Sequence, residues 1–171
     1  MTKDLTSVNR RRNLGFFYDD AAARFPDKAC IIDLFGGREH AVTYRQLDER
    51  MDAVARMLAR LGVKPGERVA MLCGNRVEFI EFFFGAMRAG AIPVPLNTRL
   101  ATDTLTYIFK DSDSVLALID PSCNREAKAI ALAVPLRQRL LLDEEADGFS
   151  GYERELAVPA PDVPPPQIAD N

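Results

Sequence analysis

The stretch VKPGERVAMLCGNRVEFIEFFFGAMRAGAIPVPLNTRL, residues 63–100, decides the fold of this chain. Lys64-Pro65-Gly66 is a turn signal, and the short apolar run at residues 68–73 is typical of a strand buried on both faces. Residues 77–89 then predict a helix that ends before Gly90, and a second strand follows. A strand–helix–strand unit of this kind places its two strands parallel in one sheet.

The start and the polar side chains of this helix carry further information. Asn75 offers an N-cap oxygen, and Glu78 three residues later completes a pattern like a capping box. Glu78, Glu81 and Arg88 form one narrow polar stripe on an otherwise apolar helix. We therefore expect Asn75 to cap the helix, and most of the helix circumference to be covered.

The second strand, residues 91–96, contains two prolines that indicate its place in the sheet. Pro93 and Pro95 are two residues apart, so their missing N–H groups face the same side. This pattern predicts a sheet edge, which the chain leaves at Asn97-Thr98-Arg99. Ligands bind at the carboxyl ends of the strands in open parallel sheets. The alternative is an ordinary loop with a solvated arginine.

Upstream of this stretch, we expect residues 1–12 to be flexible. Asn13 predicts the cap of a helix over residues 14–24, with Phe16, Phe17, Ala21 and Phe25 facing inward. Two short strands, residues 29–34 and 39–42, flank Phe35-Gly36-Gly37-Arg38. This is the strongest hairpin signal in the chain, and it predicts an antiparallel pair.

A capping box of Thr43 and Gln46 opens the next predicted helix, residues 44–61. Its apolar positions share one helical face: Leu47, Met51, Val54, Ala55, Leu58 and Leu61. The charged side chains are expected on a solvated face, with Asp52 and Arg56 forming an exposed pair one turn apart.

Downstream, alternating helices and strands complete the pattern. The predicted segments are a helix at 103–111, a strand at 115–119, a helix at 122–133 capped by Ser122, and a strand at 139–142. Together they predict an α/β fold with a mainly parallel sheet flanked by helices and an antiparallel hairpin near the start. We expect residues 13–157 to form this α/β subdomain and the proline-rich residues 158–171 to be a linker to a further part.

Composition excludes several classes of function. The chain has 171 residues, 47% apolar and 27% charged, with a net charge of −3, which gives no reason to expect nucleic acid as a partner. His40 is the single histidine, so multi-histidine metal sites are excluded, and we expect it at the surface. Cys30, Cys73 and Cys123 are far apart and predict free thiols in a reducing compartment. No apolar segment could span a bilayer or serve as a signal peptide, so a cytoplasmic location is expected.

Four pieces of the chain together carry a family resemblance: FPDKACIID, VTYRQLDERMDAVARMLARLGVKPGERVAML, GNRVEFIEFFFGAMRAGAIPVPLNTRL and YIFKDSDSVLALI. In this order and spacing, over residues 13–119, the chain resembles the amino-terminal region of the adenylate-forming superfamily, and most of all acyl-CoA synthetases. The resemblance implies a longer enzyme that activates a carboxylic acid, fatty or aromatic, with ATP and Mg²⁺, and then transfers the acyl group to CoA.

The resemblance also implies what this chain lacks. The family's phosphate loop ending in Pro-Lys-Gly, its nucleotide motifs, its magnesium-binding acid and its catalytic lysine all lie beyond the proline-rich segment. We therefore expect no catalytic residue and no metal ligand in this chain, no tightly bound cofactor, and no activity of the fragment alone. Separated from the rest of its enzyme, it would expose apolar surface and is expected to self-associate.

Asn97 and Arg99 are the candidate binding residues that the resemblance implies. Leu96-Asn97-Thr98-Arg99 matches the segment whose arginine meets the phosphate of the CoA nucleotide, at the rim of the active-site cleft. Thr98 stands where the family usually has proline, and the following Ala101-Thr102-Asp103-Thr104 departs from the family's Thr-Pro-Glu-Glu.

Other interpretations stay open at the level of sequence. The run Phe82, Phe83 and Phe84 is typical of core, although aromatic side chains can also line an acyl pocket. An adenylation domain that loads a carrier protein would share the same segments. A stand-alone interaction module without catalysis is the third alternative.

Overall fold

The computed structural model describes residues 12–164 and 166, and within them it shows a five-stranded parallel sheet and a separate two-stranded hairpin. The sheet strands, in spatial order, are β4 (Ile92–Pro95), β3 (Arg68–Leu72), β5 (Leu116–Ile119), β6 (Gln138–Leu141) and β7 (Ser150–Gly151). All neighbouring pairs in this sheet are parallel. The predicted α/β class is therefore confirmed, and β4 is an edge strand as Pro93 and Pro95 indicated.

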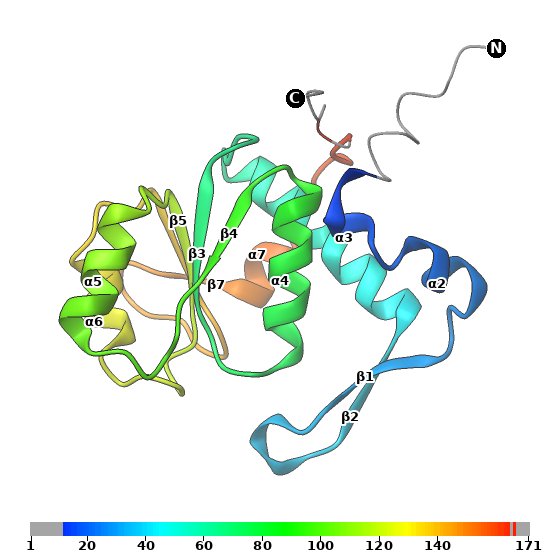
Figure 1. The fold of residues 1–171 in the computed structure, drawn as a ribbon, viewed down its shortest axis with the longest axis horizontal. Helices are drawn as coiled ribbons and strands as arrows, with labels where there is room; N and C mark the ends of the chain where they lie inside the picture. Colours follow the sequence, from blue (N-terminus) through cyan, green and yellow to red (C-terminus); the bar gives the residue numbers. More distant parts are fainter. Residues whose placement is uncertain (1–11, 165, 167–171) are drawn as a thin grey trace.

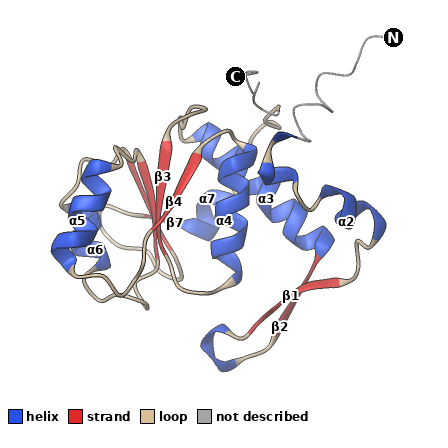
Figure 2. Ribbon diagram, in the orientation of Figure 1, coloured by secondary structure: helices blue, strands red, loops and turns tan. Residues whose placement is uncertain are grey.

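Helices cover both faces of the sheet (Figures 1 and 2). One face carries α3 (Tyr44–Arg60), α4 (Val77–Arg88) and α7 (Tyr152–Leu156), and the other carries α5 (Thr102–Asp111) and α6 (Ala127–Leu132). Alternate side chains of the strands enter the two cores: Val69 and Met71 of β3 pack with α3 and α4, while Ala70 and Leu72 pack with α5 and α6. Because both faces are covered, the central strand β5 is apolar throughout, and β3 is apolar after Arg68.

The hairpin is formed by β1 (Ala29–Asp33) and β2 (His40–Thr43), which are antiparallel and joined through η2 (Phe35–Gly37). It lies apart from the large sheet and approaches the ends of α3 and α4 (Figure 1). One side packs on α3 through Val42 and Ile31, whereas Ile32 is 61% exposed and Leu34 is 66% exposed. The expected self-association stays a prediction, but this hairpin supplies apolar surface for it.

The expected helix over residues 14–24 is wrong in extent. The segment is a short 3₁₀ turn, η1 (Leu14–Phe16), followed by α2 (Asp19–Arg24), and Phe17 and Phe25 are exposed rather than inward. The Asn13 side chain does accept a hydrogen bond from the Gly15 backbone amide through Oδ1, and it donates through Nδ2 to the Met87 carbonyl. Gly15 lies so close to α4 that an added Cβ would be 2.6 Å from the Arg88 nitrogen. This tight docking on α4 explains why the first turn does not continue as one regular helix.

The capping box of Thr43 and Gln46 is confirmed at the start of α3, but two other helix starts differ from expectation. Arg76, not Asn75, is the N-cap residue of α4, and it makes no side-chain cap bond. The Val77 amide instead donates to Asp33 of the hairpin at 3.0 Å. The helix predicted from Ser122 begins only at Ala127, because Ser122 is held in a turn by the side chain of Asp120.

The charged face of α3 is less solvated than expected. Arg88 of α4 is almost fully buried and binds Asp48 and Asp52 at 2.6 Å each, so Asp52 does not pair with Arg56. Arg56 pairs instead with Asp162, which lies in the proline-rich segment, at 3.1 Å. The predicted domain and linker boundaries stay predictions, and residues 1–11 lie outside the described part of the chain. Within the described residues, no helix has the length and hydropathy that crossing a bilayer requires.

Candidate functional site

A cleft of about 630 Å³ opens at the carboxyl ends of β3 and β4. Its lining comes from the loop after β3, the first turn of α4 and the loop after β4: Cys73, Gly74, Asn75, Phe79, Pro95, Leu96, Asn97, Thr98 and Arg99. The apolar side chains Leu96 and Phe79 form part of the wall, and the asparagines and Arg99 are exposed. This is the edge of a parallel sheet where ligands are expected.

Asn97 and Arg99, the two residues singled out from sequence, lie together in this cleft. The Arg99 amide donates to Asn97 Oδ1 at 2.9 Å, and the Leu100 amide donates to the Asn97 carbonyl at 3.1 Å. The Asn97 side chain therefore shapes its own turn. Arg99 is exposed, and no carboxylate among the described residues forms an ion pair with its guanidinium. An unpaired guanidinium beside a cleft can accept a phosphate through paired hydrogen bonds.

The loop between β3 and α4 is organised by Arg76, whose side chain is 6% exposed. Its guanidinium donates to Glu78 at 2.9 Å and to Asp143 at 2.8 Å, and it lies 4.5 Å from the ring centre of Phe35. The hydrogen bonds from Arg76 hold the pKa of Asp143 below its usual value. Arg76 thus joins the hairpin tip, α4 and the end of β6, but its charge is already compensated.

The two cysteines near the cleft are free thiols with raised pKa values. Burial is the main cause for both, and the negative charge of Asp120 adds to it. The pKa of Cys123 is raised to about 11, and that of Cys73 is raised further. Both thiols are protonated at neutral pH, so neither is an activated nucleophile.

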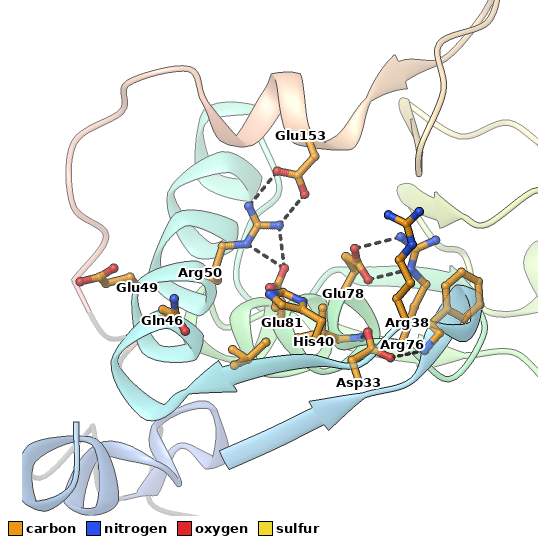
Figure 3. A pocket seen from close by; sticks show the side chains of 13 residues that line it. Asp33, Arg38, His40, Gln46, Glu49, Arg50, Arg76, Glu78, Glu81 and Glu153 are labelled. Atoms are coloured by element: carbon orange, nitrogen blue, oxygen red, sulfur yellow. Dashed lines mark hydrogen bonds and ion pairs between the residues drawn. The ribbon is translucent and has the colours of Figure 1, made fainter. Parts of the chain in front are cut away.

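A second cavity, which we call the hairpin cavity, has a volume of about 560 Å³ and lies between the hairpin, α3 and α4 (Figure 3). Its charged and polar lining residues are Asp33, Arg38, His40, Gln46, Glu49, Arg50, Arg76, Glu78, Glu81 and Glu153. His40 is exposed here, as expected from sequence. Arg50 binds Glu81 at 2.8 Å and Glu153 at 2.5 Å, linking α3 to α4 and α7.

Glu81 is the buried member of this group, with a side chain that is 4% exposed. Burial raises its pKa, and the hydrogen bonds and positive charge of Arg50 oppose the rise. Burial also raises the pKa of Tyr152, whose hydroxyl lies 3.4 Å from Glu81. The hairpin cavity therefore contains a compensated ion-pair network that holds three helices together.

Neither cavity offers a metal centre of the usual composition. Across the described residues, no group of three or more His, Cys, Asp or Glu side chains could hold a metal ion. The aromatic run behaves as core: Phe82 is fully buried, and Phe83 and Phe84 are partly buried against core clusters. The aromatic side chain that reaches the cleft is Phe79, one turn earlier on α4.

Two residues near the cleft were not found from sequence, Arg76 and Asp120. Asp120 is fully buried directly after β5, and its side chain accepts hydrogen bonds from Gly74, which lines the cleft, and from Ser122 in its own loop. An acidic residue at the carboxyl end of a wholly apolar strand was the available signal. Arg76 gave no signal, because its partners are 2, 44 and 67 residues away in the chain.

A family model described as AMP-binding enzyme matches residues 18–170. The chain is 31% identical over 166 residues to a long-chain-fatty-acid–CoA ligase of Thermus thermophilus, covering 96% of this chain and 31% of the relative. It is 42% identical over 101 residues to a 4-hydroxybenzoate–CoA/benzoate–CoA ligase of Rhodopseudomonas palustris, covering 56% of this chain and 19% of the relative. The chain thus spans less than a third of the length of these relatives.

A solved structure shows the same fold. The benzoate CoA ligase from Burkholderia xenovorans LB400 matches with a TM-score of 0.78 and 22% identity, over 92% of this chain and 30% of that chain. The similarity therefore extends from sequence to the arrangement of sheet, helices and hairpin.

Proposed function

Because the chain belongs to the family of AMP-binding enzymes, we propose that it is the amino-terminal part of an acyl-CoA synthetase that acts on fatty or aromatic carboxylic acids. The relatives named as fatty-acid and benzoate CoA ligases support this substrate range. In the proposed reaction, a carboxylate oxygen attacks the α-phosphorus of ATP and expels pyrophosphate, giving an acyl-adenylate. The CoA thiol then attacks the acyl carbon, forming a thioester and releasing AMP, while the thiol proton passes to a base.

The observation that carries the proposal is the unpaired guanidinium of Arg99 at the carboxyl edge of a parallel sheet. In the proposed enzyme, Arg99 binds a phosphate of the CoA nucleotide at the rim of the cleft. The Asn97 side chain fixes the turn that presents Arg99. Phe79 and Leu96 add apolar wall to the same cleft.

The chain itself contributes a sheet layer and one wall, not the chemistry of adenylyl transfer. Among the described residues, no group of side chains fits a metal ion. ATP and Mg²⁺ would bind to the part of the enzyme that follows in the relatives. We accordingly propose that residues 1–171 alone do not form acyl-adenylates.

The experiment separates the two half-reactions in the proposed longer enzyme. Replacing Arg99 with Ala should raise the CoA KM about five- to thirtyfold, because a solvent-screened charged hydrogen bond contributes about 1–2 kcal/mol. Acid-dependent pyrophosphate exchange should stay unchanged. Arg99→Lys should recover part of the loss, since it restores charge without the planar fork.

The matched control is Arg38→Ala, which removes another exposed arginine, at the hairpin cavity instead of the cleft. It should leave both half-reactions unchanged. An unchanged CoA KM in Arg99→Ala would remove Arg99 from the site. Pyrophosphate exchange without any CoA-dependent turnover would favour the alternative, an adenylation domain that loads a carrier protein. Acid-dependent pyrophosphate release by residues 1–171 alone would contradict the proposal that this part does not form acyl-adenylates.

A further inference from the structure

The two sides of the cleft meet beneath its surface at one buried carboxylate, Asp120. Asp120 follows β5, the strand next to β3, and is 0% exposed. Its two oxygens accept hydrogen bonds from different loops, Oδ2 from Gly74 in the loop after β3 and Oδ1 from Ser122 in the loop after β5. A buried carboxylate is costly unless hydrogen bonds compensate it, so these partners are firmly held.

The first side is the loop after β3. The Gly74 amide donates to Asp120 Oδ2 at 3.3 Å, and the Arg76 guanidinium lies 3.8 Å from the same oxygen. Gly74 itself lines the cleft. A Cβ at this glycine would lie 3.4 Å from Asp120 Oδ2 and 3.5 Å from the Phe35 ring, so the backbone is closely enclosed.

The second side is reached through the loop after β5. Ser122 donates to Asp120 Oδ1 through its amide at 3.0 Å and through its hydroxyl at 2.5 Å. Two residues later, Asn124 donates through Nδ2 to the Thr98 carbonyl at 3.3 Å. Thr98 stands between Asn97 and Arg99, so the turn that carries Arg99 is tied to the same anchor.

We propose that Asp120 is a positioning residue that sets the separation between Gly74 and the Arg99 turn, and so the fit of the cleft to CoA. This inference rests on the proposed function and deepens it. Asp120 is buried and does not line the cleft; it acts through Gly74 on one side and through Ser122 and Asn124 on the other. Oδ2 binds Gly74 and Oδ1 binds Ser122, so replacing either oxygen should loosen one of the two loops.

Asp120→Asn tests this with almost no change in volume. An amide has one accepting oxygen, so the variant must give up the bonds on one side and places an NH₂ against an existing donor. In the proposed longer enzyme, the CoA KM should rise about three- to tenfold, because small misplacements of a binding group are costly. Pyrophosphate exchange should stay within about twofold of wild type.

Asp143→Asn is the matched control. Asp143 also binds Arg76, but it makes no contact with Gly74 or Ser122 in the described structure. Its replacement should leave the CoA KM unchanged. A CoA KM that is unchanged in Asp120→Asn, or an equal loss in both half-reactions, would overturn the inference.

A second measurement does not depend on activity. Amide hydrogen exchange should become faster in both cleft loops, residues 73–76 and 97–100, in Asp120→Ala, which removes both accepting oxygens. It should not become faster in the Arg99 turn or at Gly74 in Asp143→Asn. Faster exchange in only one loop would overturn the shared anchor. If the wild-type enzyme showed no CoA-dependent turnover while amide exchange became faster in both loops of the variant, the proposed function would be wrong. The role of Asp120 in holding the two loops would still be supported.

Discussion

The sheet-edge cleft and the hairpin cavity are similar in volume, about 630 and 560 Å³, but their arginines are paired differently. Both lie at the junction of β3 and α4. In the hairpin cavity, Arg50 and Arg76 each bind at least two carboxylates, whereas Arg99 in the cleft forms no ion pair with a described residue. Size and arginine content alone would not separate a structural cavity from the proposed binding site. Pairing separates Arg50 and Arg76 from Arg99, because a compensated arginine has little capacity left for a ligand phosphate. Arg38 of the hairpin cavity is exposed and, like Arg99, forms no ion pair with a described residue, so pairing alone does not separate these two arginines.

The largest expected effect of this difference is on stability. Arg50→Ala should lower the free energy of unfolding by about 3 kcal/mol, since it leaves the buried Glu81 carboxylate without its cation. Arg99→Ala should change it by less than about 0.5 kcal/mol, because Arg99 is exposed and unpaired. Urea unfolding followed by circular dichroism measures both.

Arg45→Ala is the control for losing an arginine from α3. Arg45 pairs with Asp27 at 3.0 Å, but the two side chains are 55% and 83% exposed, so the loss should stay below about 1 kcal/mol. Comparable losses in Arg50→Ala and Arg99→Ala would break the contrast between the two cavities.

The loss of unfolding free energy caused by Arg50→Ala should depend on pH, and the direction of this dependence tests whether Glu81 is its source. The folded-state pKa of Glu81 is raised, so the stability linked to its protonated form is present at low pH and is lost as pH rises through that pKa. Without Arg50, burial acts unopposed and raises the pKa further. The deficit relative to wild type should therefore be largest above the folded-state pKa of Glu81 and shrink as pH falls through that pKa.

The double variant Arg50→Ala with Glu81→Gln supplies the comparison, because it has no carboxylate at position 81. Its stability relative to Glu81→Gln alone should be nearly independent of pH between 4.5 and 8. A deficit of Arg50→Ala that grows toward acid would show that Glu81 is not its source.

The smallest expected effect is on ligand-dependent melting of residues 1–171. At 10 mM, 3′-phosphoadenosine 5′-diphosphate, the nucleotide end of CoA, should raise the Tm by about 1 °C if its Kd is on the order of 10 mM. Arg99→Ala should abolish the shift, and Arg38→Ala in the hairpin cavity should retain it. Raised salt should weaken the shift, because the contact is exposed. A shift lost in Arg38→Ala and kept in Arg99→Ala would exchange the roles of the two cavities.

Much of the fold followed from local patterns, and most errors arose where a distant residue replaced a local partner. The apolar runs predicted β3, β5 and β6, and the paired prolines predicted the edge position of β4. Asn75 was expected to cap α4, but the Val77 amide at the helix start donates to Asp33 of the hairpin instead. Such long-range partners leave no periodic signal in the sequence.

The same limit applies to the candidate site. Arg99 could be placed at the sheet edge because its position follows directly from the strand before it. The connection between Arg99 and Asp120 could not be predicted, because it passes through Ser122 and Asn124. The sequence indicated that a helix begins at Ser122, and this interpretation left no turn there for Asp120 to hold. Asp52 and Arg56 illustrate the same point on α3: both are paired, but with Arg88 and Asp162 rather than with each other.

The prolines of β4 have a consequence for how chains meet one another. Pro93 and Pro95 lie opposite Val69 and Met71 in the register with β3, and neither has an N–H group to offer a strand arriving from outside. The outer side of β4 is therefore a poor template for cross-β stacking, the contact by which exposed strand edges nucleate fibrils. This protection depends only on β3 and β4, so it is in place as soon as these two strands have paired.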